Sequence, residues 1–384
     1  MRNFSYLVIY LTLSLQTTII AMKDGMNEIQ AVVLAAGKST RFGTHFNKLL
    51  MPLYGKPLIT HITDIVRQCG MDTTVVLGHL REQVMQAITH RIPTVSYAYQ
   101  EEQRGTGHAL LCSRSSWHCD NILVLNGDMP LLTVALIEEM IAQHKNSDAA
   151  VTFVVAYPNT TRHAYGRVLT DNEFVRIVEA KDFTGDMNYN YPINAGIYLF
   201  KRSFLETHID ELQTQNAQKQ LYVTDLIGIA SGLNFGVTLV ESSYDIVRGV
   251  NTMAEFVAVQ HAMHERIMLQ WLERGVYIED CASTWIDSTV EIGAGTRIAP
   301  GVQLRGATVI GSQCVLSPYV VIEESKLGDR VVVHPYSVIR ETHVADGTVV
   351  GPFVHLQGAE EAKPIRKMKK LRMPLSPSSS AYEL

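Results

Sequence analysis

A six-residue period dominates the chain between residues 286 and 358. Aliphatic side chains recur there with ten intervals of six residues and two of five. The positions are Ile286, Ile292, Ile298, Leu304, Ile310, Leu316, Ile322, Leu327, Val333, Ile339, Val344, Val350 and Leu356. A hexapeptide period builds a triangular parallel β-helix, in which each short face ends in a turn and each aliphatic residue points inward. At about eighteen residues per coil, the segment predicts about four coils.

The preceding part of the chain, residues 26–250, alternates short apolar runs with amphipathic stretches. The apolar runs predict strands at 31–34, 74–77, 122–125, 150–155, 197–200 and 236–240. The amphipathic stretches predict helices at 59–69, 81–88, 134–144 and 222–231, and a linking helix within 251–285. Alternating strands and helices predict a mostly parallel α/β sheet, which binds ligands at the carboxyl ends of its strands.

The first predicted strand runs into a loop of small residues that suits a polyphosphate. Ala35, Ala36 and Gly37 carry almost no side chain, so their backbone N–H groups can approach anionic oxygens closely. Lys38 and Arg41 add positive charge, and a guanidinium matches phosphate oxygens. A plain strand–turn–helix with solvent-facing cations would look the same in isolation, so the later motifs decide between the two.

Three further motifs lie at the ends of predicted strands. Asp128 follows the strand at 122–125, where a carboxylate can hold Mg²⁺ on substrate phosphates, although Asn-Gly-Asp is also a common turn. Gln100 opens a glycine-bearing loop at 100–109, and its amide can pair with a nucleobase edge; the alternative is a flexible surface loop. Asn251 offers either a second metal ligand or a cap for the linking helix.

Charge and cysteine content narrow the class of protein. The net charge of −5 gives no general attraction to nucleic acid, and five scattered cysteines without a Cys-x-x-Cys pair indicate reduced thiols. Residues 3–22 carry no charge and resemble a signal peptide, but serine, threonine and glutamine dilute their hydrophobicity. We therefore expect a cytoplasmic protein without stable membrane insertion, in which residues 1–25 belong to no folded domain. The basic, Pro/Ser-rich residues 359–384 predict a solvated tail.

In this order, the motifs resemble the sugar-phosphate nucleotidyltransferases, and most closely the bacterial N-acetylglucosamine-1-phosphate uridyltransferases with their left-handed β-helix. The resemblance covers residues 29–358. It implies a Rossmann-like α/β nucleotidyltransferase domain at 26–250, a linking helix at 251–285 and a short left-handed parallel β-helix at 286–358. It also implies Mg²⁺ as cofactor and a homotrimer built on the β-helix.

The resemblance also assigns roles to residues of this sequence. The first loop, here Leu34 to Arg41, binds the triphosphate in that family, and Lys48 matches a lysine that contacts phosphate. Arg41 and Lys48 are therefore the expected catalytic cations. The other matches are Gln100, Gly105 and Thr106 for uracil, Asp128 and Asn251 for the metal, and Gly166, Glu179, Asn194 and Thr224 for the sugar phosphate.

The implied substrates are UTP and a sugar 1-phosphate, and the implied products are UDP-N-acetylglucosamine and pyrophosphate. Two alternatives stay open. The same motifs could serve UDP-glucose, dTDP-glucose or ADP-glucose, although the loop at 100–108 favours uracil. The chain could also be a catalytically silent regulatory paralogue, against which the intact Lys48, Asp128 and Asn251 count.

Five positions depart from the family pattern. Ser39 stands where glycine is usual, Asn47 where proline is usual, Ala195 where threonine is usual and Arg248 where glutamate is common. None removes a charge that nucleotidyl transfer needs. In the β-helix, Gln357 takes the place of an arginine that acetylating relatives use, so we expect no acetyltransferase activity.

Overall fold

The structure is a computed structural model that describes residues 28–38, 42, 47–92, 94–160 and 163–358. The N-terminal segment 1–25, the basic tail 359–384, Ser39 and the expected catalytic residue Arg41 lie outside these residues. The chain divides into two compact units, one ending at Met263 and the other beginning at His264. The division falls within the long helix α9 (Met253–Glu273).

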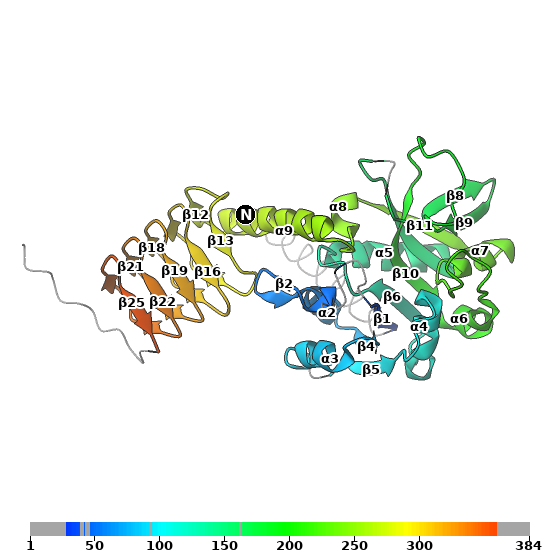
Figure 1. The fold of residues 1–384 in the computed structure, drawn as a ribbon, viewed down its shortest axis with the longest axis horizontal. Coiled ribbons are helices and arrows are strands. Elements are labelled where there is room, and N and C mark those ends of the chain that lie inside the picture. Colours follow the sequence, from blue (N-terminus) through cyan, green and yellow to red (C-terminus); the bar gives the residue numbers. More distant parts are fainter. Residues whose placement is uncertain (1–27, 39–41, 43–46, 93, 161–162, 359–384) are drawn as a thin grey trace, which may run out of the picture. The chain divides into compact units, whose positions relative to one another are not determined.

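The first unit is built on one twisted sheet (Figure 1). Seven strands follow in the order β11 (Val237–Ser242), β7 (Val151–Ala156), β10 (Ile193–Lys201), β6 (Asn121–Asn126), β1 (Ile29–Ala35), β4 (Asp72–Leu77) and β5 (Ser96–Tyr99). All neighbours pair in parallel except β10, which runs antiparallel to both β6 and β7. A hairpin of β8 (Arg167–Asp171) and β9 (Phe174–Val178) extends from β10. The expectation of a mostly parallel α/β sheet is thereby confirmed.

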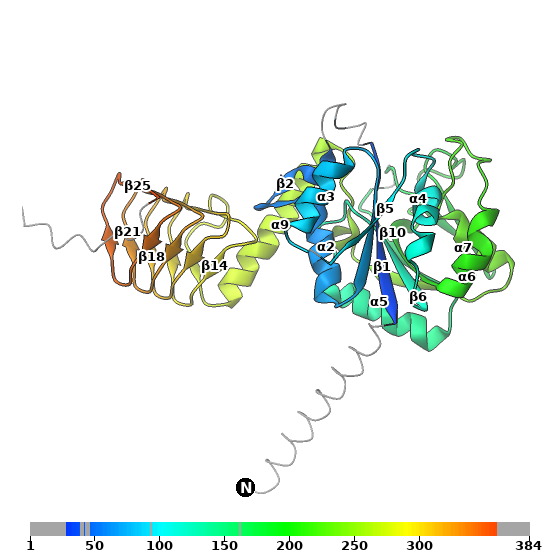
Figure 2. The same cartoon turned by 90° about the horizontal axis from the view of Figure 1, so that it is seen from below.

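Helices cover both faces of the sheet (Figure 2). On one face α2 (Leu58–Gln68) and α5 (Val134–Ser147) pack against each other and against the strands. On the other face α4 (Thr106–Cys112), α6 (Arg202–His208) and α7 (Asp225–Gly232) join one apolar cluster with strand residues such as Val32 and Val124. The remaining helices are α3 (Arg81–Thr89), α8 (Tyr244–Val247) and three 3₁₀ turns, η2 (Lys48–Leu50), η3 (Arg114–Ser116) and η4 (Ile209–Glu211). Burial on both faces explains why the strands read as continuous apolar runs in the sequence.

The segment 100–109 was expected to be a loop, and this expectation is wrong in its second half. Helix α4 begins at Thr106, directly after Gly105. Gly105 has φ +108°, and a Cβ there would lie 2.3 Å from the carbonyl oxygen of Leu221. Only glycine allows this turn, which ends the loop and starts the helix beside another part of the chain.

The second unit is a parallel β-helix with three sheets, as the six-residue period predicts. The first sheet comprises β12 (Tyr277–Ile278), β15 (Arg297–Ile298), β18 (Val315–Leu316), β21 (Val332–Val333) and β24 (Val349–Val350). The second comprises β13 (Trp285–Ile286), β16 (Gln303–Arg305), β19 (Val321–Glu323), β22 (Val338–Arg340) and β25 (His355–Gln357). The third comprises β14 (Glu291–Ile292), β17 (Val309–Ile310), β20 (Lys326–Leu327) and β23 (His343–Val344). The short left-handed β-helix that the family resemblance implies is confirmed. Ile286 pairs in register with Leu304, whereas Ile322 pairs with Ile339, so the coil shortens by one residue toward the end of the chain.

Among the described residues, no helix is both long and apolar enough to cross a membrane.

Candidate active site

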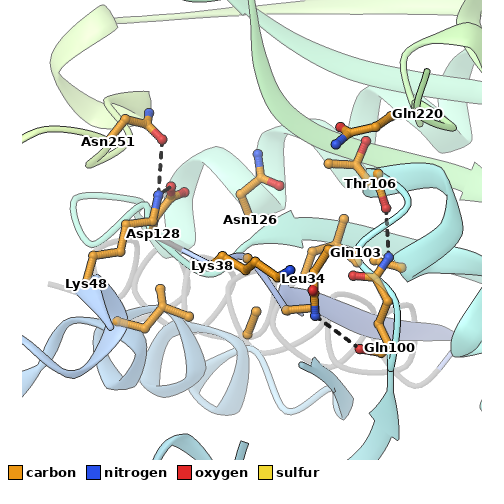
Figure 3. Close-up of a pocket in the computed structure, with 16 residues that line it drawn as sticks. Leu34, Lys38, Lys48, Gln100, Gln103, Thr106, Asn126, Asp128, Gln220 and Asn251 are labelled. Carbon is orange, nitrogen blue, oxygen red and sulfur yellow. Dashed lines mark hydrogen bonds and ion pairs between the residues drawn. The ribbon is translucent and has the colours of Figure 1, made fainter. Parts of the chain in front are cut away.

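Lys48, Asp128 and Asn251 meet at one point at the carboxyl edge of the sheet (Figure 3). The Lys48 ammonium forms an ion pair with Asp128 Oδ2 and donates hydrogen bonds to Asn251 Oδ1 at 3.1 Å and to the Val250 carbonyl at 2.8 Å. The Lys48 and Asp128 side chains are 15% and 16% exposed, so water screens their attraction only in part. Two side-chain oxygens are therefore aimed at one cation.

The backbone places these three side chains. Asp128 follows β6, and its carbonyl accepts a hydrogen bond from the Val250 amide at 3.0 Å, which brings Asn251 beside it. Lys48 is the first residue of η2, and the Asn47 side chain caps that turn by accepting from the Leu49 amide at 3.0 Å. Asparagine at position 47 thus has a structural role as an N-cap.

The Asn251 side chain accepts a hydrogen bond from Lys48 and does not cap the linking helix α9. Thr252 Oγ1 instead accepts from the Glu255 amide at 3.2 Å at the start of α9. The Glu255 carboxylate reaches back to the Asn251 amide at 2.7 Å. These two contacts satisfy the first turn of the helix, so the Asn251 side chain can point to Lys48.

A cavity of about 590 Å³ opens beside this cluster. Of the residues expected to bind nucleotide, it is lined by Leu34, Ala35, Ala36, Gly37, Lys38, Lys48, Gln100, Gly105, Thr106, Asp128 and Asn251. The first loop, the segment from Gln100 to Thr106 and the candidate metal ligands, far apart in sequence, are therefore brought together. Gly37 and Lys38 are exposed, as a phosphate-binding loop requires.

The Gln100 side chain is held rigidly at the end of β5. Gln100 as a whole is 3% exposed, and its side-chain nitrogen donates a hydrogen bond to the Gly105 carbonyl at 3.0 Å. Thr106 Oγ1 accepts from the Val223 amide at 3.1 Å and ties this segment to the chain before α7. Gln103 also lines the cavity and donates to the Gln100 carbonyl at 3.4 Å (Figure 3).

A second cavity of about 230 Å³ adjoins the first. All four residues expected to meet the sugar phosphate line it, namely Gly166, Glu179, Asn194 and Thr224. The two cavities share five lining residues, which are Leu34, Thr106, Asn126, Asp128 and Asn251. The shared wall thus contains both candidate metal ligands.

Hydrogen bonds orient the polar side chains of this second cavity. The Thr224 hydroxyl donates to Glu179 Oε1 at 3.1 Å, and burial is the main cause that raises the pKa of the Glu179 carboxyl. Asn194 Nδ2 donates to the Tyr198 hydroxyl at 2.6 Å, and Asn194 Oδ1 accepts from the Gly196 amide at 3.1 Å. Burial likewise raises the pKa of Tyr198, so its phenol stays neutral.

Gly166 makes room for that carboxylate. A Cβ at this position would lie 3.4 Å from both Glu179 oxygens and 3.0 Å from a methyl carbon of Ile177. Any side chain there would fill the space between the carboxylate and the cavity.

Several lining residues escaped the sequence analysis. Asn126 lines both cavities, Gln103 and Gln220 line the larger one, and Tyr165 and Tyr198 line the smaller one. Asn126 precedes Asp128 by two positions, at the end of the same strand, and this alternation could have identified it. Gln220 and Tyr165 lie on irregular segments, where no periodicity points to a ligand.

Two residues that depart from the family pattern, Ala195 and Arg248, differ in their relation to the cavities. Ala195 lines the smaller cavity. Arg248 lines neither cavity. Its guanidinium forms an ion pair with Asp245 at 3.0 Å and lies over the Tyr244 ring. Of these two residues, Ala195 alone can therefore alter the smaller cavity directly.

The oxygen donors fit a magnesium ion in part. Asp128 and Asn251 supply a carboxylate and an amide oxygen that already converge on one cation, which is the donor chemistry that Mg²⁺ prefers. The described residues contain no group of three His, Cys, Asp or Glu side chains able to hold a metal. An ion here would thus take its other ligands from phosphate oxygens and water.

Comparison with known proteins identifies the family. The family model of the MobA-like NTP transferase domain matches residues 31–180. The bifunctional protein GlmU of Geotalea uraniireducens is 35% identical over 316 residues, covering 79% of this chain and 67% of that protein. The chain belongs to the GlmU family. The GlmU protein of Trichlorobacter lovleyi is 37% identical over 300 residues, and the match covers 77% of this chain and 65% of that relative.

A solved structure supports the fold. A protein of Entamoeba histolytica, provisionally described as a UDP-N-acetylglucosamine pyrophosphorylase, aligns with a TM-score of 0.52 at 12% identity. The alignment covers 68% of this chain and 87% of that protein. At this identity the likeness concerns the fold alone, which matches the GlmU family assignment.

Proposed function

We propose that this protein transfers UMP from UTP to N-acetylglucosamine 1-phosphate, yielding UDP-N-acetylglucosamine and pyrophosphate. The observation that carries the proposal is the pair of adjoining cavities whose common wall contains Asp128 and Asn251. A nucleotidyl transfer joins two phosphorylated substrates at one phosphorus atom, so it needs two pockets that meet at a charge-neutralising centre. The many GlmU relatives support the same activity.

The larger cavity suits the triphosphate. Its lining includes the small residues of the first loop, whose backbone N–H groups can approach phosphate oxygens, and the described cations Lys38 and Lys48. Gln100 and Lys48 lie on opposite sides of the cavity (Figure 3). If the phosphates bind beside Lys48, the base would therefore lie beside Gln100.

The smaller cavity suits a sugar. Glu179 provides a carboxylate that accepts hydrogen bonds from hydroxyl or amide groups, and Asn194 keeps an N–H available because only one of its two is engaged with Tyr198. Such a site penalises analogues that lack the matching polar atoms.

The reaction needs no general base. The phosphate monoester of the sugar, with a second pKa near ~6, is already largely dianionic at neutral pH. Its oxygen attacks the α-phosphorus of UTP, the bond to the β-phosphate oxygen breaks, and pyrophosphate leaves. Lys48 would neutralise phosphate charge, while Asp128 and Asn251 would hold Mg²⁺, which supplies Lewis-acid stabilisation of that charge.

Pyrophosphate release from UTP, CTP, ATP and dTTP with a panel of sugar 1-phosphates tests the proposal. We expect UTP with N-acetylglucosamine 1-phosphate and Mg²⁺ to be the best combination. A preference for glucose 1-phosphate or for ATP would contradict it, and so would inactivity with every pair.

The sugar cavity can be tested separately with Glu179→Gln. This change keeps the shape but removes the carboxylate, so KM for the sugar phosphate should rise about tenfold while KM for UTP stays within about twofold. Glu173→Gln is the matched control, because Glu173 is exposed and lines neither cavity. Equal effects of the two variants would remove Glu179 from the sugar site.

A further inference from the structure

The amide of Gln100 has two acceptors for its two N–H groups. Its nitrogen lies 3.0 Å from the Gly105 carbonyl oxygen and 3.0 Å from Nδ1 of His108. A carbonyl oxygen can only accept, so the atom facing Gly105 must be the amide nitrogen. This contact identifies which branch of the amide carries the nitrogen, and both acceptors hold it there.

His108 lies behind Gln100 and outside the cavity lining. It belongs to α4, is half-buried and does not line either of the two cavities. Since the Gln100 nitrogen donates, Nδ1 of His108 must be unprotonated, and the ring proton must be on Nε2. Cys112, one turn along the helix, places its sulfur 3.9 Å from Nε2.

The side-chain oxygen of Gln100 is left for a ligand. Gln100 lines the nucleotide cavity, and Oε1 accepts no hydrogen bond from any residue that the structure describes. In Figure 3 a dashed line ends at the Gln100 side-chain nitrogen, and the oxygen lies on the other branch of the amide. A base with an N–H donor on its pairing edge would satisfy this oxygen, whereas a base with a ring-nitrogen acceptor there would face it with a second lone pair.

We propose that His108 is a positioning residue, which holds the Gln100 amide with its oxygen toward the base and so makes the site select uracil over cytosine. Uracil has a donor at N3, and cytosine has an acceptor at the same position. Turning the amide over to suit cytosine would set its oxygen against both the Gly105 carbonyl and the His108 Nδ1 lone pair. The inference rests on the proposed pyrimidine nucleotide site and names what sets its selectivity.

Replacing His108 separates this role from a structural one. His108→Leu removes the acceptor at Nδ1, and His108→Asn keeps one, because Asn Oδ1 can take the place of Nδ1 in a side chain that branches at the same carbon as leucine. His118→Leu is the control, since His118 is exposed and contacts Asp72 away from both cavities. The readout is the ratio of dissociation constants for CTP and UTP by calorimetry, which does not depend on turnover.

We expect His108→Leu to lower the CTP/UTP ratio about fivefold, the effect of losing one neutral hydrogen bond, and mainly by weakening UTP. His108→Asn and His118→Leu should stay within about twofold of the wild type. An unchanged ratio in His108→Leu, an equal loss in both His108 variants, or a wild type that binds the two nucleotides equally would overturn the inference.

A measurement on the unaltered protein covers the case in which His108→Leu does not fold. Nitrogen-15 NMR of the histidine rings, assigned by the signal missing in His108→Asn, should show His108 protonated on Nε2 and not on Nδ1. A proton on Nδ1 at neutral pH would overturn the inference. Nucleotide selectivity without any pyrophosphate release would contradict the proposed function and leave the role of His108 standing.

Discussion

Removing the Lys48 ammonium tests the centre of the proposed active site. In Lys48→Met, Asp128 loses its cation and the Asn251 oxygen loses its donor. Losing a phosphate or metal-centre contact of this kind typically costs ~3 kcal/mol in the transition state, so kcat should fall about a hundredfold. The protein should also lose stability, because a carboxylate that is only 16% exposed is left without its ion-pair partner among the residues that the structure describes.

The stability loss lies between two limits. Breaking a fully buried pair costs about 3–5 kcal/mol, and breaking an exposed pair costs about 0–1 kcal/mol. With about one-sixth of each side chain exposed, the pair lies nearer the buried limit, so we expect about 3 kcal/mol, measured by urea unfolding without divalent ions. Mg²⁺ should stabilise Lys48→Met more than the wild type, because it can neutralise the Asp128 that Lys48 no longer pairs with.

Lys56→Met is the matched control. Lys56 pairs with Asp64 at 2.8 Å, the two side chains are 16% and 11% exposed, and neither lines the two cavities. It should also lose free energy of unfolding, but less than Lys48→Met because Arg67 still lies 3.9 Å from Asp64, while its kcat stays within about twofold. If both variants lost activity equally, or if Lys48→Met kept near-normal turnover, the assignment of Lys48 would be wrong.

Three further predictions concern pH, assembly and acyl transfer. Burial lowers the pKa of His61 to about 4 from 6.5, so the unfolded chain binds its proton first as the pH falls. Its stabilising contribution is complete above pH 6.5 and should decrease by about 2 kcal/mol between pH 7.5 and 5, a slope that His61→Gln should flatten in urea unfolding. The full chain should be a homotrimer by light scattering, and a chain ended after Arg274 should be an active monomer, because every proposed substrate contact precedes that residue; a monomeric full chain would contradict this. Glucosamine 1-phosphate should cause no thiol release from acetyl-CoA, since Gln357 supplies no positive charge, and measurable release would refute it.

Local pattern predicted most elements of the fold. The strands at 122–125 and 197–200 lie inside β6 and β10, and the amphipathic stretch at 59–69 nearly coincides with α2. These segments are long or strongly apolar, and their burial follows directly from side-chain periodicity. Helix α4 was missed because its start depends on a glycine whose conformation is dictated by Leu221, more than a hundred residues away.

The candidate site was only partly predictable. Gln100, Asp128 and Asn251 could be chosen from motifs, because glycine-rich turns and polar residues at strand ends are visible in the sequence. Gln220 and Tyr165 could not be assigned to a cavity in advance, since neither position carries a pattern of its own. Their proximity to the site follows from the packing of the sheet.

The β-helix follows from the sequence by itself, because each coil repeats the same local geometry and the period alone tells which side chains point inward. The shortening of its later coils is also visible in the sequence, where intervals of five replace intervals of six. Tertiary structure alone decided that β10 runs antiparallel between β6 and β7. It also brought Lys48 to residues 80 and 203 positions away, a contact that no local pattern records because it depends on how distant strand ends meet.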